Sequence, residues 1–311
     1  MINRIIIQLI FYKNMFNRLL SILLKEGPSI LVRKIKNRTM LTYYPKHEKN
    51  GVKIKNLKDY KDKISIIIPT KDKLFVLKNC LNSIIHNTDY KNFEIILIDN
   101  KSNKKTKRFL KSLNDKKIKI LEFNQEFNFS KVCNLGASLA DSNYLLFLNN
   151  DTEIIDKNWI KYMVMGTKIK RIGAVGCKLL FPNNRIQHNG IILNPEHICQ
   201  HIDYLKEDYK ESYDAKYVSA VTAACLLIKK DIFKEINGFD ETLPLINNDI
   251  DLCLKLHKLG YSILCINKPL LYHYESLTRG KTYSKQSNNY IKNKWKNELM
   301  NDNYYKYDIK T

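Results

Sequence analysis

Apolar, strand-like runs alternate with helix-like stretches across residues 64–151. The runs are apolar along most of their length, as expected for strands that are buried on both faces. This alternation predicts an α/β fold with a doubly wound, mostly parallel sheet, right-handed crossovers and flanking helices. The strand-like runs lie at 64–70, 93–99, 118–123 and 143–151, and the helix-like stretches at 72–88, 104–113 and 130–140.

The chain has 311 residues, enough for one main domain with small appendages. We expect a basic, partly amphipathic N-terminal helical extension at 1–62 and the main domain at 63–282. Residues 283–311 are expected to form a C-terminal helix and tail.

The formal charge of +22 is distributed unevenly. Residues 1–63 carry 15 Lys and Arg against 4 Asp and Glu, so half of the excess lies in this segment. Such a balance suits an anionic membrane surface, phosphorylated substrates or nucleic acid. The sequence has no zinc-finger or RNA-recognition signature, so nucleic acid is not an expected partner.

The first 38 residues combine apolar side chains at roughly helical spacing with basic residues such as Lys13 and Arg18. No uninterrupted run of 18 apolar residues occurs, and no cleavage site follows. We expect an interfacial helix on an anionic membrane, with packing on the protein's own core as the alternative. The seven scattered cysteines have no CxxC pair, which favours reduced thiols and a cytoplasmic location, peripheral to the membrane.

Asp151 ends the apolar run at 143–151 after two amides, Asn149 and Asn150. Carboxyl ends of parallel strands are where open α/β sheets bind ligands, and a carboxylate there suits a divalent cation with a phosphate. The alternative is that Asp151 caps the following segment.

Three further residues in the C-terminal third are candidates for chemistry. Asp249 begins a predicted helix at 249–259 after a polar loop, and it suits either a substrate hydroxyl or a solvated helix end. Asp249 and Asp251 diverge by about 200° on a helix, so only one of them is expected to face a ligand. His273 follows a strand-like run and Arg279 lies in a polar loop; a structural histidine and a surface arginine are the alternatives.

Several motifs in a fixed order resemble glycosyltransferase family 2, particularly the rhamnosyltransferase-like branch that builds bacterial O-antigen and other surface polysaccharides. The resemblance covers about 64–305. The motifs are IIIPTKD at 66–72, EIILIDNKS at 94–102, FNFSKVCNLGASLA at 127–140, FLNND at 147–151, IQHNG at 186–190, VTAACLLIKKDIF at 221–233, GFD at 238–240, NDIDLCLKLHKLGY at 248–261 and YHYESLTRG at 272–280.

The resemblance implies a GT-A fold and an inverting, metal-dependent transfer from a nucleotide-activated sugar. The family's DxD metal motif falls on Asn149, Asn150 and Asp151, so only its last acid is retained. His273 is implied as the second ligand of Mn²⁺ or Mg²⁺, and Asp249 as the catalytic base. The residues implied to contact the nucleotide sugar are Thr70, Asp72, Asp99, Lys131, Asn134, Asn150 and Arg279.

The expected reaction moves a sugar from dTDP-rhamnose or a UDP-sugar to a hydroxyl of a growing, lipid-linked cell-surface glycan. An ionised Asp can accept the proton of that hydroxyl as the new bond forms. The alternatives are a nucleotide-sugar hydrolase and a non-catalytic nucleotide-sugar-binding protein.

Overall fold

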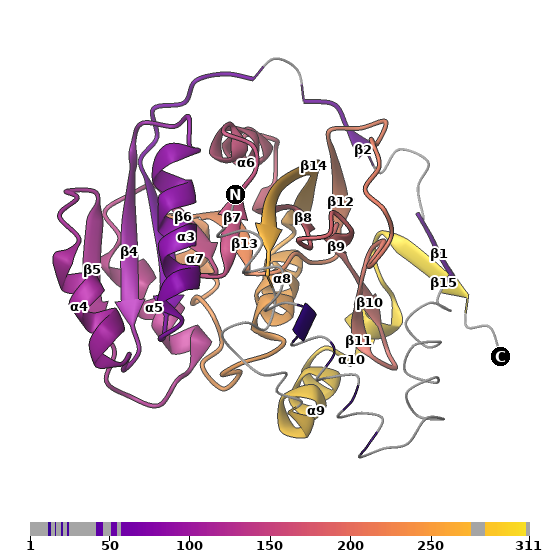
Figure 1. Cartoon of the computed structure of the whole chain (residues 1–311). Helices are drawn as coiled ribbons and strands as arrows, with labels where there is room; N and C mark the ends of the chain where they lie inside the picture. The colour runs from indigo at the N-terminus through magenta and orange to yellow at the C-terminus, as the bar shows by residue number, and fades with distance from the viewer. Residues whose placement is uncertain are drawn as a thin grey trace.

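The structure is a computed structural model that describes residues 42–45, 51–54, 57–274 and 284–308, together with positions 12, 13, 16, 20 and 24. Its centre is an 11-stranded sheet with helices on both faces (Figure 1). Most of the N-terminal segment 1–38 lies outside the described residues. Within the described part of the chain, no helix combines the length and the hydropathy needed to cross a bilayer.

The first half of the sheet is parallel and confirms the predicted alternation. Strand β3 pairs with β4 and β6, and β4 pairs with β5, all in parallel. Strands β3, β4 and β6 are mostly apolar and buried along their whole length because helices cover both faces, whereas the edge strand β5 is largely exposed. The bounds are β3 (Ile64–Thr70), α3 (Leu74–His86), β4 (Phe93–Asp99), α4 (Lys104–Ser112), β5 (Ile118–Glu122), α5 (Phe129–Leu139) and β6 (Tyr144–Leu148).

The second half of the sheet is mixed. Strand β13 lies antiparallel between β6 and β8, and β14 runs parallel to β8. The short strands β7 and β9 pair with β14 and β8, and β12 and β2 complete the edge. The bounds are β2 (Gly51–Val52), β7 (Thr152–Ile154), β8 (Ile172–Leu180), β9 (Ile186–His188), β12 (Ala215–Val218), β13 (Cys225–Lys229) and β14 (Ser262–His273).

Two small antiparallel pairs stand apart from the main sheet. Strand β10 pairs with β11, and β1 pairs with β15, so segments close to the two ends of the chain lie side by side. The remaining bounds are β1 (Thr42–Pro45), α6 (Trp159–Thr167), β10 (Ile191–Asn194), β11 (Ile198–His201), α7 (Lys230–Glu235), α8 (Asn248–Lys258), α9 (Lys285–Lys294), α10 (Lys296–Met300) and β15 (Tyr305–Asp308).

The two faces of the sheet form two hydrophobic clusters. One cluster contains residues of α5, α7 and α8, and the other contains residues of α3 and α6. Helix α5 lies very close to the sheet at Gly136, where an added Cβ would meet Ile67 Cγ2 at 2.5 Å and Ile98 Cδ1 at 2.8 Å. This close packing sets the position of the loop at 123–128, which precedes α5 at the carboxyl end of the parallel strands.

Candidate active site

The end of β6 and the end of β14 meet at the carboxyl edge of the sheet. Strand β7 follows the 149–151 turn and pairs with β14, placing Thr152 opposite His273. Asp151 Oδ1 lies 3.2 Å from His273 Nε2, and both side chains are buried. The two predicted metal ligands, 122 positions apart in the sequence, are therefore adjacent.

The side-chain amides of Gln187 and Asn149 define which ring nitrogen of His273 faces a hydrogen-bond acceptor and which faces a donor. Nδ1 lies 3.0 Å from Gln187 Oε1, which can only accept a hydrogen bond, so Nδ1 carries the proton. Asn149 Nδ2 lies 3.2 Å from Nε2 and can only donate, so Nε2 presents its lone pair. The tautomer with its lone pair on Nε2 is the one that can bind a metal through that nitrogen, in place of the Asn149 contact.

The donor set fits a hard divalent cation. In an octahedral site with bonds of about 2.1 Å, two adjacent ligands lie about 3.0 Å apart, close to the separation between Asp151 and His273. A ring nitrogen and a carboxylate oxygen at that distance can share either a proton or a cation. Among the described residues, no group of three or more His, Cys, Asp or Glu side chains is arranged for a metal. Two protein ligands suffice for Mg²⁺, which commonly takes its others from water and substrate phosphates.

Asp249 lies at the start of α8 beside the same turn. Together with Asn149 it lines a pocket of about 110 Å³, which also includes Phe129, Thr222 and Asn248. Asp249 Oδ2 accepts a hydrogen bond from the amide of Ala223 at 3.3 Å, and the side chain is only partly buried. The candidate base and the turn that bears Asp151 therefore border one cavity.

The ends of β3 and β4 form the neighbouring part of the site. Asn150 Nδ2 donates to Thr70 Oγ1 at 3.0 Å, which links the 149–151 turn to the end of β3. Asp99 accepts a hydrogen bond from the amide of Ser102, and Asp72 Oδ1 accepts one from the amide of Asn103 at 2.6 Å. The structure brings these predicted nucleotide-sugar contacts to one edge of the sheet, while their role in binding stays a prediction.

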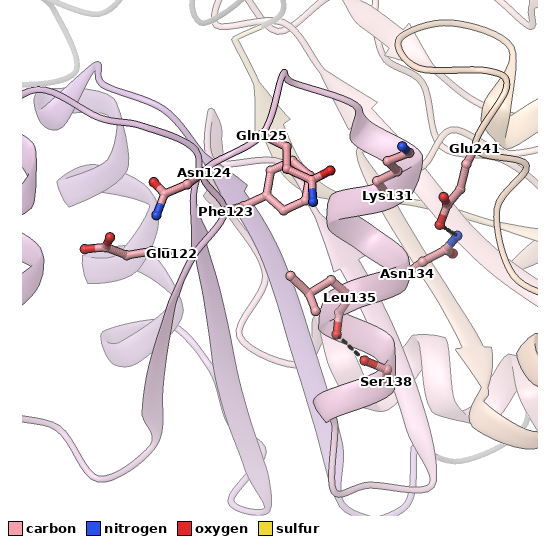
Figure 2. Close-up of a pocket in the computed structure, with 9 residues that line it drawn as sticks. All are labelled: Glu122, Phe123, Asn124, Gln125, Lys131, Asn134, Leu135, Ser138 and Glu241. Atoms are coloured by element: carbon pink, nitrogen blue, oxygen red, sulfur yellow. Dashed lines mark hydrogen bonds between the residues drawn. The ribbon is translucent and has the colours of Figure 1, made fainter.

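Lys131 and Asn134 lie on α5 and line a second, more open pocket of about 740 Å³ (Figure 2). The Asn134 amide accepts a hydrogen bond from Phe239 N and donates to Phe239 O and to Glu241. These contacts attach the loop after α7 to α5. Arg279, the remaining predicted contact, lies outside the described residues.

Cys80, on α3, contacts the 149–151 turn and the residue that follows it. Its Sγ lies 3.7 Å from Asn149 O and 3.6 Å from Thr152 Oγ1. Burial raises the pKa of the Cys80 thiol to about 12, so the group is protonated at neutral pH. A protonated, buried thiol is a structural donor and not a metal ligand.

Gln187 is a site residue that the sequence analysis did not identify. It lies on β9 and is 5% exposed, and its amide contacts His273 across 86 positions. The available signal was a short polar group, Gln187, His188 and Asn189, beside the apolar residues 191–193 and inside the motif IQHNG. Nothing local in the sequence indicates that the amide faces His273.

Comparisons with known proteins agree with this geometry. The profile described as Glycosyl transferase family 2 matches residues 65–236. O-antigen biosynthesis protein RfbC of Myxococcus xanthus is 31% identical over 224 residues, which are 70% of this chain and 18% of that protein. Amylovoran biosynthesis glycosyltransferase AmsB of Erwinia amylovora is 25% identical over 230 residues, 69% of this chain and 70% of that protein.

Among solved structures, GalNAc-T7 with UDP, GalNAc and Mn²⁺ is similar in fold, with a TM-score of 0.60 and 15% identity. The match covers 76% of this chain and 50% of that one. The sheet, parallel in its first half and covered by helices on both faces, thus has a GT-A fold, as predicted. Because the profile matches more than half of its residues, this chain belongs to glycosyl transferase family 2.

Proposed function

We propose that the protein is an inverting, metal-dependent glycosyltransferase. It would move a sugar from a nucleotide-sugar donor, dTDP-rhamnose or a UDP-sugar, to a hydroxyl of a growing, lipid-linked cell-surface glycan. The observation that carries the proposal is the pocket shared by Asn149 and Asp249, because it places a carboxylate beside the turn that bears Asp151. A transferase needs this pairing of a proton acceptor with a diphosphate-binding centre.

Asp151 and His273 would hold the divalent cation, which would neutralise charge on the departing nucleoside diphosphate. Gln187 would keep the Nε2 lone pair of His273 directed at it. The Asp249 carboxylate would take the proton of the acceptor hydroxyl while the hydroxyl oxygen bonds to the anomeric carbon. The bond from that carbon to the diphosphate breaks on the opposite face, so a single displacement inverts the anomeric centre.

The names and contents of similar proteins support this assignment. RfbC and AmsB are named for O-antigen and amylovoran biosynthesis, and the GalNAc-T7 structure contains UDP and Mn²⁺. The chain spans 18% of the length of RfbC, so acceptor and pathway are carried over only as part of the proposal. A non-catalytic nucleotide-sugar-binding protein would not need the Asp249 carboxylate beside the 149–151 turn.

We also propose that the N-terminal segment attaches the enzyme to the cytoplasmic face of the membrane. Phe16, Leu20 and Leu24 are helical, spaced four apart, and 63%, 39% and 75% exposed. Residues four apart lie on one side of a helix, so these three would form an exposed apolar stripe if they belong to one helix. The basic residues of 1–38 would add attraction to anionic lipid headgroups.

A nucleotide-sugar screen tests the proposed function. The purified chain would be heated with dTDP-rhamnose, UDP-glucose, UDP-GlcNAc or GDP-mannose, each with and without Mn²⁺, and its melting temperature recorded. We expect one donor to raise the melting temperature only when the metal is present. Product analysis with and without a lipid-linked acceptor then separates transfer from hydrolysis. Absence of stabilisation by every donor would contradict the proposal.

A further inference from the structure

The first turn of α8, which carries Asp249, is attached to the C-terminal segment through Asp251. Asp251 is fully buried, and its Oδ1 accepts a hydrogen bond from Trp295 Nε1 at 2.8 Å and one from Lys294 Nζ at 2.7 Å. As its divergence from Asp249 on a helix predicts, Asp251 points away from the pocket. It is a structural anchor and not an alternative base.

Lys294 joins a second segment to this anchor. Its Nζ also lies 2.9 Å from Asp240 Oδ2, in the loop that follows α7. Burial opposes the charge on Lys294, but the hydrogen bonds to Asp251 and Asp240 outweigh burial and raise its pKa. Tyr290, also on α9, donates to the same Asp240 oxygen at 2.7 Å. Helix α9 therefore connects α8 to the loop at 238–243.

The other side of Asp249 is held in the same way. Asn247 Nδ2 donates to Asn288 Oδ1 of α9 at 2.7 Å. Asn247 precedes α8 with a φ of 63° and provides no side-chain cap for the helix. Within the first turn, the amides of Asp249 and Ile250 donate to the side chains of Asn248 and Asp249. Beyond these local bonds, Asn247 and Asp251, on the two sides of Asp249, are bonded to α9 and Trp295.

A buried charge cluster is a poor way to gain stability, because desolvation offsets much of the attraction. The cluster does fix the orientation of the Asp251 side chain, since the Trp295 N–H and the Lys294 ammonium must both reach its Oδ1. Apolar packing of Trp295 alone, which is 4% exposed, would tolerate small rotations of α8. The cluster restricts such rotations at the turn where proton transfer would occur.

We propose that Lys294 and Trp295 are positioning residues that set the direction of the Asp249 carboxylate through Asp251. This inference rests on the proposed role of Asp249 as the base. A displacement of about 1 Å at a reacting group costs up to a hundredfold in rate. The C-terminal segment therefore contributes to turnover without touching donor or acceptor.

The test compares Lys294→Met and Trp295→Phe with Lys292→Met in the full chain. Lys292 lies on the same helix, but its Nζ donates to Glu196 O beside the β10–β11 pair and not to α8. Hydrogen–deuterium exchange at 248–252 would be measured together with kcat and KM, using the donor returned by the screen. The double variant Asp251→Asn/Lys294→Met removes both charges together and keeps an oxygen acceptor for Trp295.

We expect Lys294→Met and Trp295→Phe to speed exchange at 248–252 and to lower kcat by about tenfold to a hundredfold. The KM of the donor should stay within about twofold, and the double variant, which also lacks the Lys294 bond to Asp251, should keep the low kcat of Lys294→Met. Recovery of kcat in the double variant would assign the loss to an uncompensated buried charge and would overturn the positioning role. Unchanged kcat in folded Lys294→Met and Trp295→Phe, or an equal loss in Lys292→Met, would overturn the inference. Exchange is measured without substrate, so it tests the contacts of Lys294 and Trp295 with Asp251 separately from catalysis. Normal turnover in Asp249→Asn would instead refute the proposed function.

Discussion

Gln187 accepts a hydrogen bond from Nδ1 of His273 at 3.0 Å, with both side chains buried. This bond leaves the Nε2 lone pair facing Asp151 Oδ1 at 3.2 Å. A histidine that binds a metal usually donates its other ring N–H to an acceptor that fixes its orientation and tautomer, and the Gln187 oxygen is such an acceptor. At the proposed metal site, Gln187 would therefore contribute to metal affinity.

The first prediction concerns this amide. Gln187→Leu keeps a similar volume but removes the acceptor of the Nδ1 proton, so Mn²⁺ affinity should fall by about tenfold to a hundredfold. Calorimetric titration of Mn²⁺ with nucleotide present would measure it, and His273→Ala and Asp151→Ala should lose the binding. Gln200→Leu, in the neighbouring β11, serves as a control that should bind normally. Equal affinities in Gln187→Leu and Gln200→Leu would argue against the assigned site.

Asp249→Asn tests proton removal. The amide is isosteric but cannot accept the proton, so turnover should fall by about two to four orders of magnitude. Metal-dependent donor binding should change little, because the carboxylate is proposed to contact the acceptor hydroxyl. Asp231→Asn, an exposed acid in the first turn of α7, is the control. Near-normal turnover of Asp249→Asn would remove this residue from the mechanism.

The exposed N-terminal stripe predicts lipid binding. A variant with Phe16, Leu20 and Leu24 all changed to Ser should co-sediment less with anionic liposomes than the unchanged chain. The unchanged chain should also bind less as salt rises, since screening weakens its attraction to the headgroups. Neutral liposomes provide the comparison. If removal of residues 1–38 leaves sedimentation unchanged, the segment does not attach the protein to lipid.

Close packing at Gly136 predicts a loss of stability on enlargement. A methyl group at this position would lie within 2.8 Å of Ile67 and Ile98, and these side chains are themselves fully buried. Gly136→Ala should therefore lower the free energy of unfolding by about 1–3 kcal/mol despite the better helix propensity of Ala. Urea unfolding would measure the change. Leu139→Ala, on the exposed side of α5, should cost less.

Asp240 predicts a pH dependence of stability. Burial would raise the pKa of its carboxyl, but hydrogen bonds from Thr242, Tyr290 and Lys294 outweigh burial and lower it well below 3.8. The ionised form thus stabilises the fold above pH 3.8, and this contribution declines as the pH falls below that value.

Asp240→Asn should accordingly lower the melting temperature at about pH 7 and have less effect at about pH 3. Exposed Glu126→Gln is the control and should show no such dependence. A melting-temperature difference that is the same at both pH values would contradict the assigned ionisation.

The sequence by itself determined the parallel half of the fold and the order of its elements. Strands such as β3 and β4 are apolar along most of their length because they are buried on both faces, and this leaves a local signal. The position of Asp151 was determined in the same way, because a carboxylate that ends such a strand must lie at the sheet edge. The resemblance to family 2 added His273 and Asp249, which local patterns left with alternatives.

Only the tertiary structure decided which side chains meet across long separations. The contact of Gln187 with His273 and that of Asp251 with Trp295 depend on the pairing of β9 with β8 and on the docking of α9. Sequence periodicity reports which face of an element is buried, but it carries no information about the partner that buries it. The roles of these contacts therefore became visible only once the sheet and the C-terminal segment were in place.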